Sequence, residues 1–146
     1  MTSDAASGEA TETVHATSVA RHDLAVLLFG RSGAGKSDLA LRLIDRGWSL
    51  VSDDYTIVAR HGASAVASPP PSIAGRMEVR GIGIVGMPHR TAVPVALLCD
   101  LDGLVERMPG ACTGTVAGIA LPRIVLAALE PSAPLKLELA LQRITA

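Results

Sequence analysis

The segment Leu24–Phe29 (LAVLLF) and the eight residues after it, Gly30-Arg31-Ser32-Gly33-Ala34-Gly35-Lys36-Ser37, decide the fold of this 146-residue chain. The continuous apolar run is short enough for a strand that is buried on both faces. From Lys36 onward the apolar period changes, because Leu39 and Leu43 stand four residues apart on one side of a predicted helix. Gly47 suits the end of that helix. Strand, glycine-rich turn and helix in this order are typical of an α/β protein.

The rest of the chain predicts further strands and one more helix. Strands are expected at residues 48–52, 77–85, 92–99 and 121–129, a hairpin at 55–60 and 63–67, a loop at 102–116, and a helix at 134–144. The predicted fold is therefore α/β, a single domain that contains a phosphate-binding loop (P-loop), a mixed, largely buried sheet and a β-hairpin region. We expect residues 1–12 to be a flexible lead-in and residues 13–146 to form the domain.

Composition and charge exclude several classes of protein. Hydrophobic residues make up 49% of the chain and charged residues 18%, which is too apolar for a disordered protein. The net charge of −1 offers no basic footprint for nucleic acid. No apolar run approaches the ~20 residues that cross a membrane, and the first residues lack a signal pattern. Cys99 and Cys112 form neither a disulfide framework nor a CxxC motif, so we expect a reducing cytoplasm.

The glycine-rich segment matches the phosphate-binding pattern G-x-x-x-x-G-K-[ST] in the required strand-to-helix context. Glycines keep side chains away from the ligand, and backbone N–H groups and a helix N-terminus then face the phosphates. Lys36 is expected to reach the β- and γ-phosphates, and Ser37 to bind Mg²⁺. The predicted nucleotide-binding residues are Gly30, Arg31, Ser32, Gly33, Ala34, Gly35, Lys36 and Ser37. The loop predicts a bound nucleotide with Mg²⁺, and ATP is the expected nucleotide, but many kinds of NTPase and kinase share this loop.

Acidic residues near predicted strand ends are the candidates for chemistry. Asp53 and Asp54 close the strand that follows the helix, where ligands of α/β sheets bind. They are either the carboxylates that orient and deprotonate an attacking hydroxyl or two residues of a solvated turn. Glu78 is either a metal ligand or one partner of an exposed salt bridge. Asp100 follows a buried apolar run, so it is either a Walker B aspartate, which would lie near the magnesium ion, or a turn residue at the end of a strand.

Taken together, His15, residues 30–58 (GRSGAGKSDLALRLIDRGWSLVSDDYTIV) and residues 77–85 (MEVRGIGIV) resemble the catalytic domain of the bacterial HPr kinase/phosphorylase family. The helix length, the paired aspartates and the E-x-R-G-x-G-I segment agree with the family in order and spacing. The resemblance covers residues 13–100 closely and the remainder loosely, and it is to the short form found in some proteobacteria. It implies a Mg²⁺-ATP-dependent kinase in which Lys36 holds the phosphates and Ser37 and Glu78 bind the metal.

The resemblance also implies roles for residues outside the loop. Asp54 would accept the proton of the serine that is phosphorylated, and Asp53 would support it. His15 would lie in the active site close to the loop, and Arg107 stands where the family has an active-site arginine. The substrate would be a small HPr-like phosphocarrier protein of a phosphotransferase system, whose regulation of carbohydrate use is the family's cellular role. The family's hexamers imply a homo-oligomer.

The chain departs from the family pattern at two places, and other functions stay open. No N-terminal domain precedes residue 13, and the family's dephosphorylation segment is not recognisable in residues 119–136, which leaves reverse phosphorylase activity open. The alternative is a nucleotide-binding module that regulates a partner such as a sensor kinase, with little catalysis. A small-molecule kinase is disfavoured because residues 102–118 contain too few basic side chains for a lid.

Overall fold

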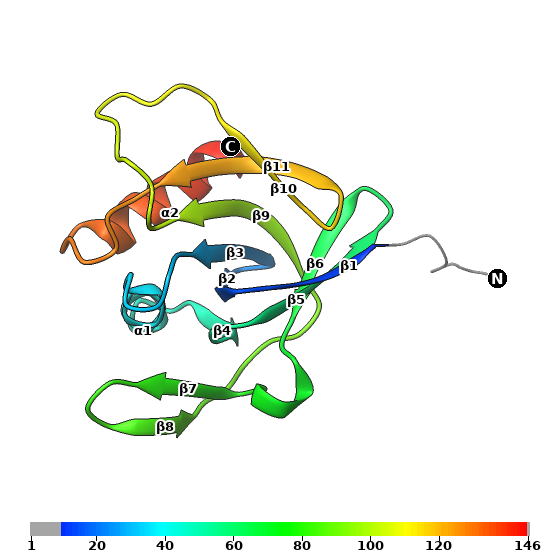
Figure 1. The fold of residues 1–146 in the computed structure, drawn as a ribbon, viewed down its shortest axis with the longest axis vertical. Helices are drawn as coiled ribbons and strands as arrows, with labels where there is room; N and C mark the ends of the chain where they lie inside the picture. The colour runs from blue at the N-terminus through cyan, green and yellow to red at the C-terminus, as the bar shows by residue number, and fades with distance from the viewer. Residues whose placement is uncertain (1–9, 146) are drawn as a thin grey trace.

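The structure, a computed structural model, describes residues 10–145 (Figure 1). Two helices and a short 3₁₀ turn accompany the strands in this range. In chain order the elements are β1 (Thr11–Val14), β2 (Ala16–Arg21), β3 (Leu24–Phe29), α1 (Lys36–Asp45), β4 (Ser49–Ser52), β5 (Thr56–His61), β6 (Ser64–Ser68), η1 (Pro71–Ile73), β7 (Arg76–Val79), β8 (Gly83–Gly86), β9 (Val93–Asp100), β10 (Thr113–Val116), β11 (Ile119–Val125) and α2 (Ala133–Thr145).

One mixed sheet of nine strands organises the described residues, with β7 and β8 apart as a two-stranded hairpin. The strand order is β1-β5-β6-β9-β3-β2-β4, and β11 carries β10 beside the end of β9. β3 and β11 run parallel to β9, whereas β2 is antiparallel to both β3 and β4. Figure 1 shows that this sheet is strongly curled and that β1, β5 and β6 bend away from the layer formed by β3 and β9. The predicted α/β class with a mixed sheet and a hairpin region is confirmed.

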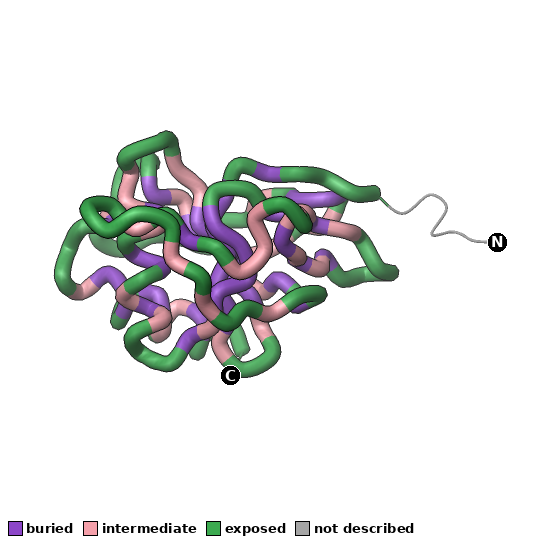
Figure 2. Tube along the Cα trace, turned by 90° about the horizontal axis from the view of Figure 1, so that it is seen from below, coloured by how far each residue is buried: buried purple, intermediate pink, exposed green. Residues whose placement is uncertain are grey.

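Both faces of the central strands are buried, as the apolar run of β3 predicts. Val26 and Leu28 face a core that includes α1 and α2, and Ala25 and Leu27 face a second core that includes β5 and β6. All four side chains are fully buried, and purple segments run through the middle of the tube in Figure 2. A strand covered on both faces needs no alternation of polar and apolar residues. This burial holds the end of β3, and the loop that follows it, in a fixed position.

Several predicted elements are confirmed with small shifts of their ends. The strand at 48–52 is β4, the strand at 92–99 is β9, and the helix at 134–144 is α2. The predicted hairpin is formed by β5 and β6, which pair from Ile57↔Ser68 to His61↔Ser64. Gly62 in its two-residue loop has φ 64°, a left-handed conformation that suits glycine.

Three predictions about the second half of the chain were wrong. Residues 77–85 are not one strand, because the chain reverses between β7 and β8, where Gly81 and Gly83 have φ 88° and 116°. Residues 113–116, expected within a loop, form β10 and pair with β11. The strand expected at 121–129 is β11, which ends at Val125, and residues 126–130 pack instead against the start of α1. Local apolar content does not reveal a chain reversal whose turn residues are glycines inside an apolar segment.

The N-terminal end of the domain differs slightly from the predicted boundary. Most of the expected lead-in lies outside the described residues, and β1 begins at Thr11, two residues before the predicted domain start. β1 pairs with β5, with the register running from Thr11↔Ala59 to Val14↔Thr56.

Within residues 10–145, no helix has the length and apolar character needed to span a bilayer.

Glu138 of α2 connects this C-terminal helix to the end of α1 through side-chain hydrogen bonds. Its carboxylate accepts hydrogen bonds from Arg46 Nη2 at 2.6 Å, Arg46 Nε at 3.0 Å and Trp48 Nε1 at 3.0 Å. The hydrogen bond from Arg46 is the main cause that lowers the pKa of Glu138, and burial of the carboxyl opposes it. Because the folded-state pKa is depressed, the stability that this group contributes is present above the ordinary value and is lost as pH falls through the folded pKa.

Glu138→Gln is expected to reduce the free energy of unfolding at pH 7 by about 1.5 kcal/mol, the scale of a hydrogen bond to a charged group. The difference from wild type should shrink as pH falls below 4.5, the ordinary value for the group. Urea unfolding followed by circular dichroism between pH 7 and 3 measures this. Glu130→Gln is the matched control, because Glu130 forms an exposed pair with Lys136 that should contribute little. A wild-type to variant difference that stays constant down to pH 3 would contradict the assignment.

Candidate active site

The glycine-rich loop, residues 30–35, leaves the buried end of β3 and turns directly into α1. Gly33 and Gly35 have φ 87° and 98°, and a Cβ on Gly30 would lie 2.8 Å from the Cβ of Ala34. The loop closes on itself, with the Ala34 N–H donating to the Arg31 carbonyl at 3.0 Å. These positions require glycine because of backbone conformation or contact, and the loop ends at a helix N-terminus that favours an anion.

Lys36 lies inside this loop. Its side chain turns back so that Nζ donates to the carbonyl oxygens of Gly30 at 2.5 Å and Arg31 at 3.1 Å, and the residue is 6% exposed. Within residues 10–145, no carboxylate forms an ion pair with it. The ammonium group is bound by carbonyl oxygens and has no carboxylate of the described residues beside it, so its positive charge inside the loop is not neutralised by an acidic partner.

Asp53 follows the end of β4 and points towards the start of α1. It is 7% exposed; its Oδ1 accepts from Ser37 Oγ at 2.6 Å and Thr17 Oγ1 at 3.2 Å. Its Oδ2 accepts from the Glu78 N–H at 3.1 Å, and no cationic side chain of the described residues pairs with it. A buried carboxylate beside a serine hydroxyl is an oxygen donor set that fits Mg²⁺.

Asp54 diverges from Asp53 although the two residues are adjacent. Its φ of 70° is left-handed, and its N–H donates to Thr17 Oγ1 at 3.1 Å. Its carboxylate, 58% exposed, lies 2.9 Å from Nε2 of His15, whose ring stacks on Tyr55 with centroids 4.9 Å apart. Aspartate tolerates this backbone conformation better than most residues. The turn therefore directs one carboxylate to Ser37 and the other to His15 and solvent.

Of the two remaining predicted site residues, Glu78 contacts this centre through its backbone and Arg107 does not contact it. The Glu78 backbone reaches Asp53, whereas the Glu78 side chain is exposed on β7. Arg107 is exposed in the long connection between β9 and β10, and it makes no hydrogen bond or ion pair with another described residue. Within residues 10–145 no group of three or more His, Cys, Asp or Glu side chains could hold a metal ion. Mg²⁺ commonly binds through one or two carboxylates together with waters and substrate phosphates.

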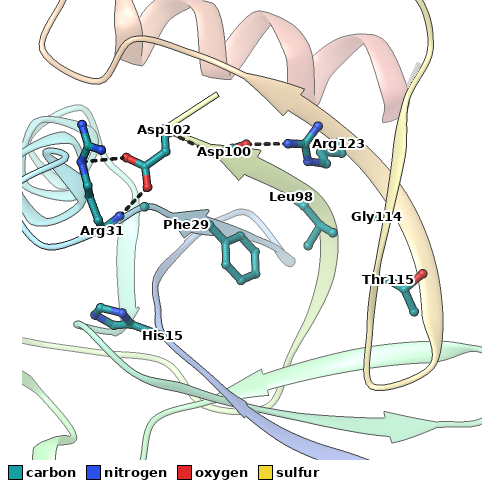
Figure 3. A pocket seen from close by; sticks show the side chains of 10 residues that line it. His15, Phe29, Arg31, Leu98, Asp100, Asp102, Gly114, Thr115 and Arg123 are labelled. Carbon is teal, nitrogen blue, oxygen red and sulfur yellow. Dashed lines mark hydrogen bonds and ion pairs between the residues drawn. The ribbon is translucent and has the colours of Figure 1, made fainter. Parts of the chain in front are cut away.

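A pocket of about 510 Å³ opens beside the first two residues of the loop (Figure 3). Phe29 and Leu98 line it between the ends of β3 and β9, and the β10–β11 hairpin lines the opposite side. His15 also lines the pocket, and its ring contacts the Asp54 carboxylate. Neither Asp54 nor the Ser37–Asp53 pair lines the pocket, and His15 is the residue that connects the pocket to the Asp54 carboxylate.

Sequence reasoning missed the residue that separates the two aspartates. The Thr17 hydroxyl donates to Asp53 and accepts from the Asp54 N–H, so it holds both residues of the turn. Thr17 lies in β2, whereas His15 forms the bend between β1 and β2, so no strand alternation links the two residues. No local pattern in the sequence singles out Thr17, because its partners lie 36 and 37 residues further along the chain. Arg123 and Asp102 were missed as well: Arg123 donates to the candidate Asp100, and Asp102 accepts from the Arg31 N–H of the loop.

The fold and the site define a mixed-sheet α/β domain with a glycine-rich turn, a buried lysine and a serine–aspartate pair. The HPr Serine kinase C-terminal domain family matches residues 8–90, more than half of the chain, and the chain belongs to this family. The structure described as the Hpr(Ser) kinase/phosphatase from Coxiella burnetii is similar over 90% of this chain and 95% of that one, with a TM-score of 0.79 and 27% identity.

The curated relatives match only part of this chain and a smaller part of their own length. The HPr kinase/phosphorylase of Chlorobium phaeobacteroides is 44% identical over 73 residues, which are 49% of this chain and 23% of the relative. That of a Geobacillus species is 36% identical over 100 residues, 63% of this chain and 32% of the relative. The chain thus matches between about a quarter and a third of the length of these relatives.

Proposed function

We propose that this protein is a Mg²⁺-ATP-dependent serine kinase that phosphorylates a small HPr-like phosphocarrier protein. The observation that carries the proposal is the divergence of Asp53 and Asp54 on either side of Thr17. One carboxylate is buried beside the serine of the glycine-rich loop, and the next is exposed beside a histidine that lines a pocket. Phosphoryl transfer requires an oxygen ligand that binds the metal ion and a separate group that accepts the proton of the attacking hydroxyl.

The glycine-rich loop is the proposed phosphate-binding P-loop of ATP. The carbonyls that now hold Lys36 Nζ place its charge at the concave side of the loop, within reach of bound phosphates. Ser37 and Asp53 are the proposed Mg²⁺ ligands, and Glu78 is a further ligand whose backbone already contacts Asp53. When bound, the metal neutralises charge on the phosphates.

Asp54 is the proposed general base. Its exposed carboxylate can reach a hydroxyl that arrives from the side of the pocket, and the Tyr55-stacked ring of His15 holds its orientation. Positioning and charge neutralisation account for most of the acceleration in phosphoryl transfer, so a well-held base is what this site must supply. Arg107 lies on the long β9–β10 connection and makes no contact with Asp54 or His15 among the described residues.

Family membership supports the remaining parts of this proposal. The relatives are HPr kinase/phosphorylases. We extend the kinase direction to this chain, together with a cytoplasmic location and a homo-oligomeric assembly. We propose the kinase direction alone, because the family's dephosphorylation segment is not recognisable in residues 119–136.

The experiment that tests the proposal measures transfer of labelled γ-phosphate from ATP, with Mg²⁺, to the phosphocarrier protein of the same organism. Label that appears on a serine of the carrier supports the kinase. ATP binding without transfer, under conditions in which the Coxiella enzyme transfers phosphate, would contradict it. That outcome would instead support a nucleotide-binding module that regulates a partner such as a sensor kinase.

Glu78→Gln is expected to raise the Mg²⁺ concentration required for half-maximal transfer by about tenfold, since a neutral amide is a weaker ligand for a hard cation than a carboxylate. The backbone N–H that contacts Asp53 is retained in this variant. A magnesium titration of transfer at saturating ATP measures the effect. Glu106→Gln is the control, because Glu106 is exposed in the β9–β10 connection and contacts none of the described site residues. A titration curve that coincides with wild type would remove Glu78 from the metal site.

A further inference from the structure

Four side chains form a connected group between β11 and the glycine-rich loop (Figure 3). Asp100 stands at the end of β9, where it pairs in register with Phe29 of β3 and Val125 of β11. Its Oδ2 accepts from Arg123 Nη2 at 2.5 Å, and its Oδ1 accepts from the N–H groups of Asp102 at 2.8 Å and Gly103 at 3.2 Å. Arg123 therefore holds Asp100, and Asp100 holds the backbone of the turn that carries Asp102.

Asp102 in turn contacts the first residues of the loop. Its Oδ2 accepts the Arg31 N–H at 2.6 Å, and its Oδ1 lies 3.8 Å from Arg31 Nε. The adjacent Leu101 N–H donates to the Phe29 carbonyl at 2.8 Å. Figure 3 shows the Asp102 carboxylate directed towards Arg31 and away from Arg123. Two successive residues after β9 thus bind the chain on both sides of Gly30.

We propose that Asp102 is a positioning residue that fixes the start of the phosphate-binding loop, and that Arg123 maintains it through Asp100. A hydrogen bond from a backbone N–H to a carboxylate is charge-assisted and stronger than one between neutral groups. It restrains the peptide groups of Gly30 and Arg31, whose carbonyls also hold Lys36. A loop that is ordered before the nucleotide binds loses less entropy on binding.

This role differs from that of the residues that would touch the nucleotide. The Asp102 carboxylate is directed at the outer end of the loop, next to Arg31, whose side chain is 85% exposed. It acts on the phosphates through the Arg31 and Gly30 backbone. Its loss should therefore affect affinity for MgATP more than the rate at saturating MgATP. The nucleotide measurement rests on the proposed function, whereas the order of the loop can be measured without any ligand.

The test compares Asp102→Ala and Asp102→Asn by amide hydrogen exchange and by calorimetric titration with MgATP. In Asp102→Ala we expect exchange of the Arg31 amide to accelerate about tenfold, and the Kd for MgATP to rise about tenfold, as for the loss of one charge-assisted hydrogen bond. In Asp102→Asn the side-chain carbonyl can still accept the Arg31 N–H, so protection should largely return. Urea unfolding of both variants should match wild type, which separates local loop order from global stability.

Substitutions at Arg123 test the second half of the proposal. Arg123→Ala should accelerate Arg31 exchange in the same direction as Asp102→Ala, and Arg123→Lys should restore part of the protection by keeping the cation beside Asp100. The matched control is Asp23→Ala, since Asp23 pairs with Arg90 in an ion pair remote from the loop. It should change neither measurement.

Two outcomes would overturn the inference. One is wild-type protection of the Arg31 amide in Asp102→Ala, and the other is equal acceleration in the Ala and Asn variants. Failure of the proposed function looks different, because wild type itself would then bind no MgATP while the exchange measurements still report on the Asp102 contact. The MgATP titration and the hydrogen-exchange measurement therefore test the proposed function and the Asp102 contact independently.

Discussion

Lys36→Ala is expected to abolish phosphate transfer, with a loss of at least about a thousandfold, and to weaken MgATP binding about tenfold to a hundredfold. Lys36 Nζ is buried and lies between two carbonyls of the loop, with no acidic partner among the described residues. Its charge is therefore available to the phosphates. Stabilisation of negative charge that develops in the transition state is worth more than stabilisation of the ground state, so transfer should fall further than binding.

The measurement for Lys36 pairs labelled phosphate transfer with calorimetric MgATP titration. Removal of this buried side chain also takes a donor from the Gly30 and Arg31 carbonyls, of which the Arg31 carbonyl keeps the Ala34 N–H, so circular dichroism is needed to confirm the fold. Lys36→Met, which retains the volume of the stem, provides a second variant. Lys136→Ala is the natural control, because Lys136 pairs at the surface with Glu130 of the same region. Transfer that survives in a folded Lys36→Met protein would exclude this loop as the catalytic phosphate site.

Asp54→Asn is expected to lower transfer by about 10²–10⁴-fold, the contribution of a general base, while the Kd for MgATP changes by no more than about twofold. Asparagine is the informative substitution because it tolerates the left-handed φ of 70° at this position and removes only the charge and basicity. Alanine would introduce backbone strain and would confuse the comparison. The buried Ser37–Asp53 pair is untouched, so nucleotide binding should persist.

Asp53→Asn provides the contrast for Asp54. Loss of the buried carboxylate should weaken both Mg²⁺-dependent binding and transfer, because Asp53 lies beside Ser37 and not beside the pocket. Equal losses of binding and transfer in Asp54→Asn would show that Asp54 is structural. Equal behaviour of the two asparagine variants would show that the divergence of the adjacent carboxylates has no functional meaning. Single-turnover transfer at saturating MgATP, beside a binding titration, distinguishes these results.

Much of the fold and of the proposed site was predictable from short-range patterns. The boundaries of β3 and the start of α1 follow from an apolar run and a change of period, and both are confirmed. The places that failed share a physical cause. Glycines inside residues 77–85 reverse the chain, and β10 is a short, mostly exposed strand whose pairing with β11 supplies its order. Neither feature leaves a periodic apolar signal.

The different contacts of Asp53 and Asp54 could not be predicted from the sequence, for a related reason. Two adjacent aspartates look equivalent in the chain, and the resemblance assigns Asp53 a merely supporting role. The structure places Asp53 against Ser37 and Asp54 against His15, because Thr17 of a neighbouring strand binds both. Thr17 and the aspartates are more than 30 residues apart in the chain, and strand pairing brings them together.

The sequence by itself determined the α/β class, the glycine-rich turn between a buried strand and a helix, and membership of the family, because these depend on local periodicity and on residues close together in the chain. The tertiary structure alone decided which way each carboxylate points, which loop holds the Arg31 amide, and where the pocket opens. Those properties arise from contacts between residues such as Arg31 and Asp102, 71 positions apart, and their geometry depends on how the packed strands align at one edge of the sheet.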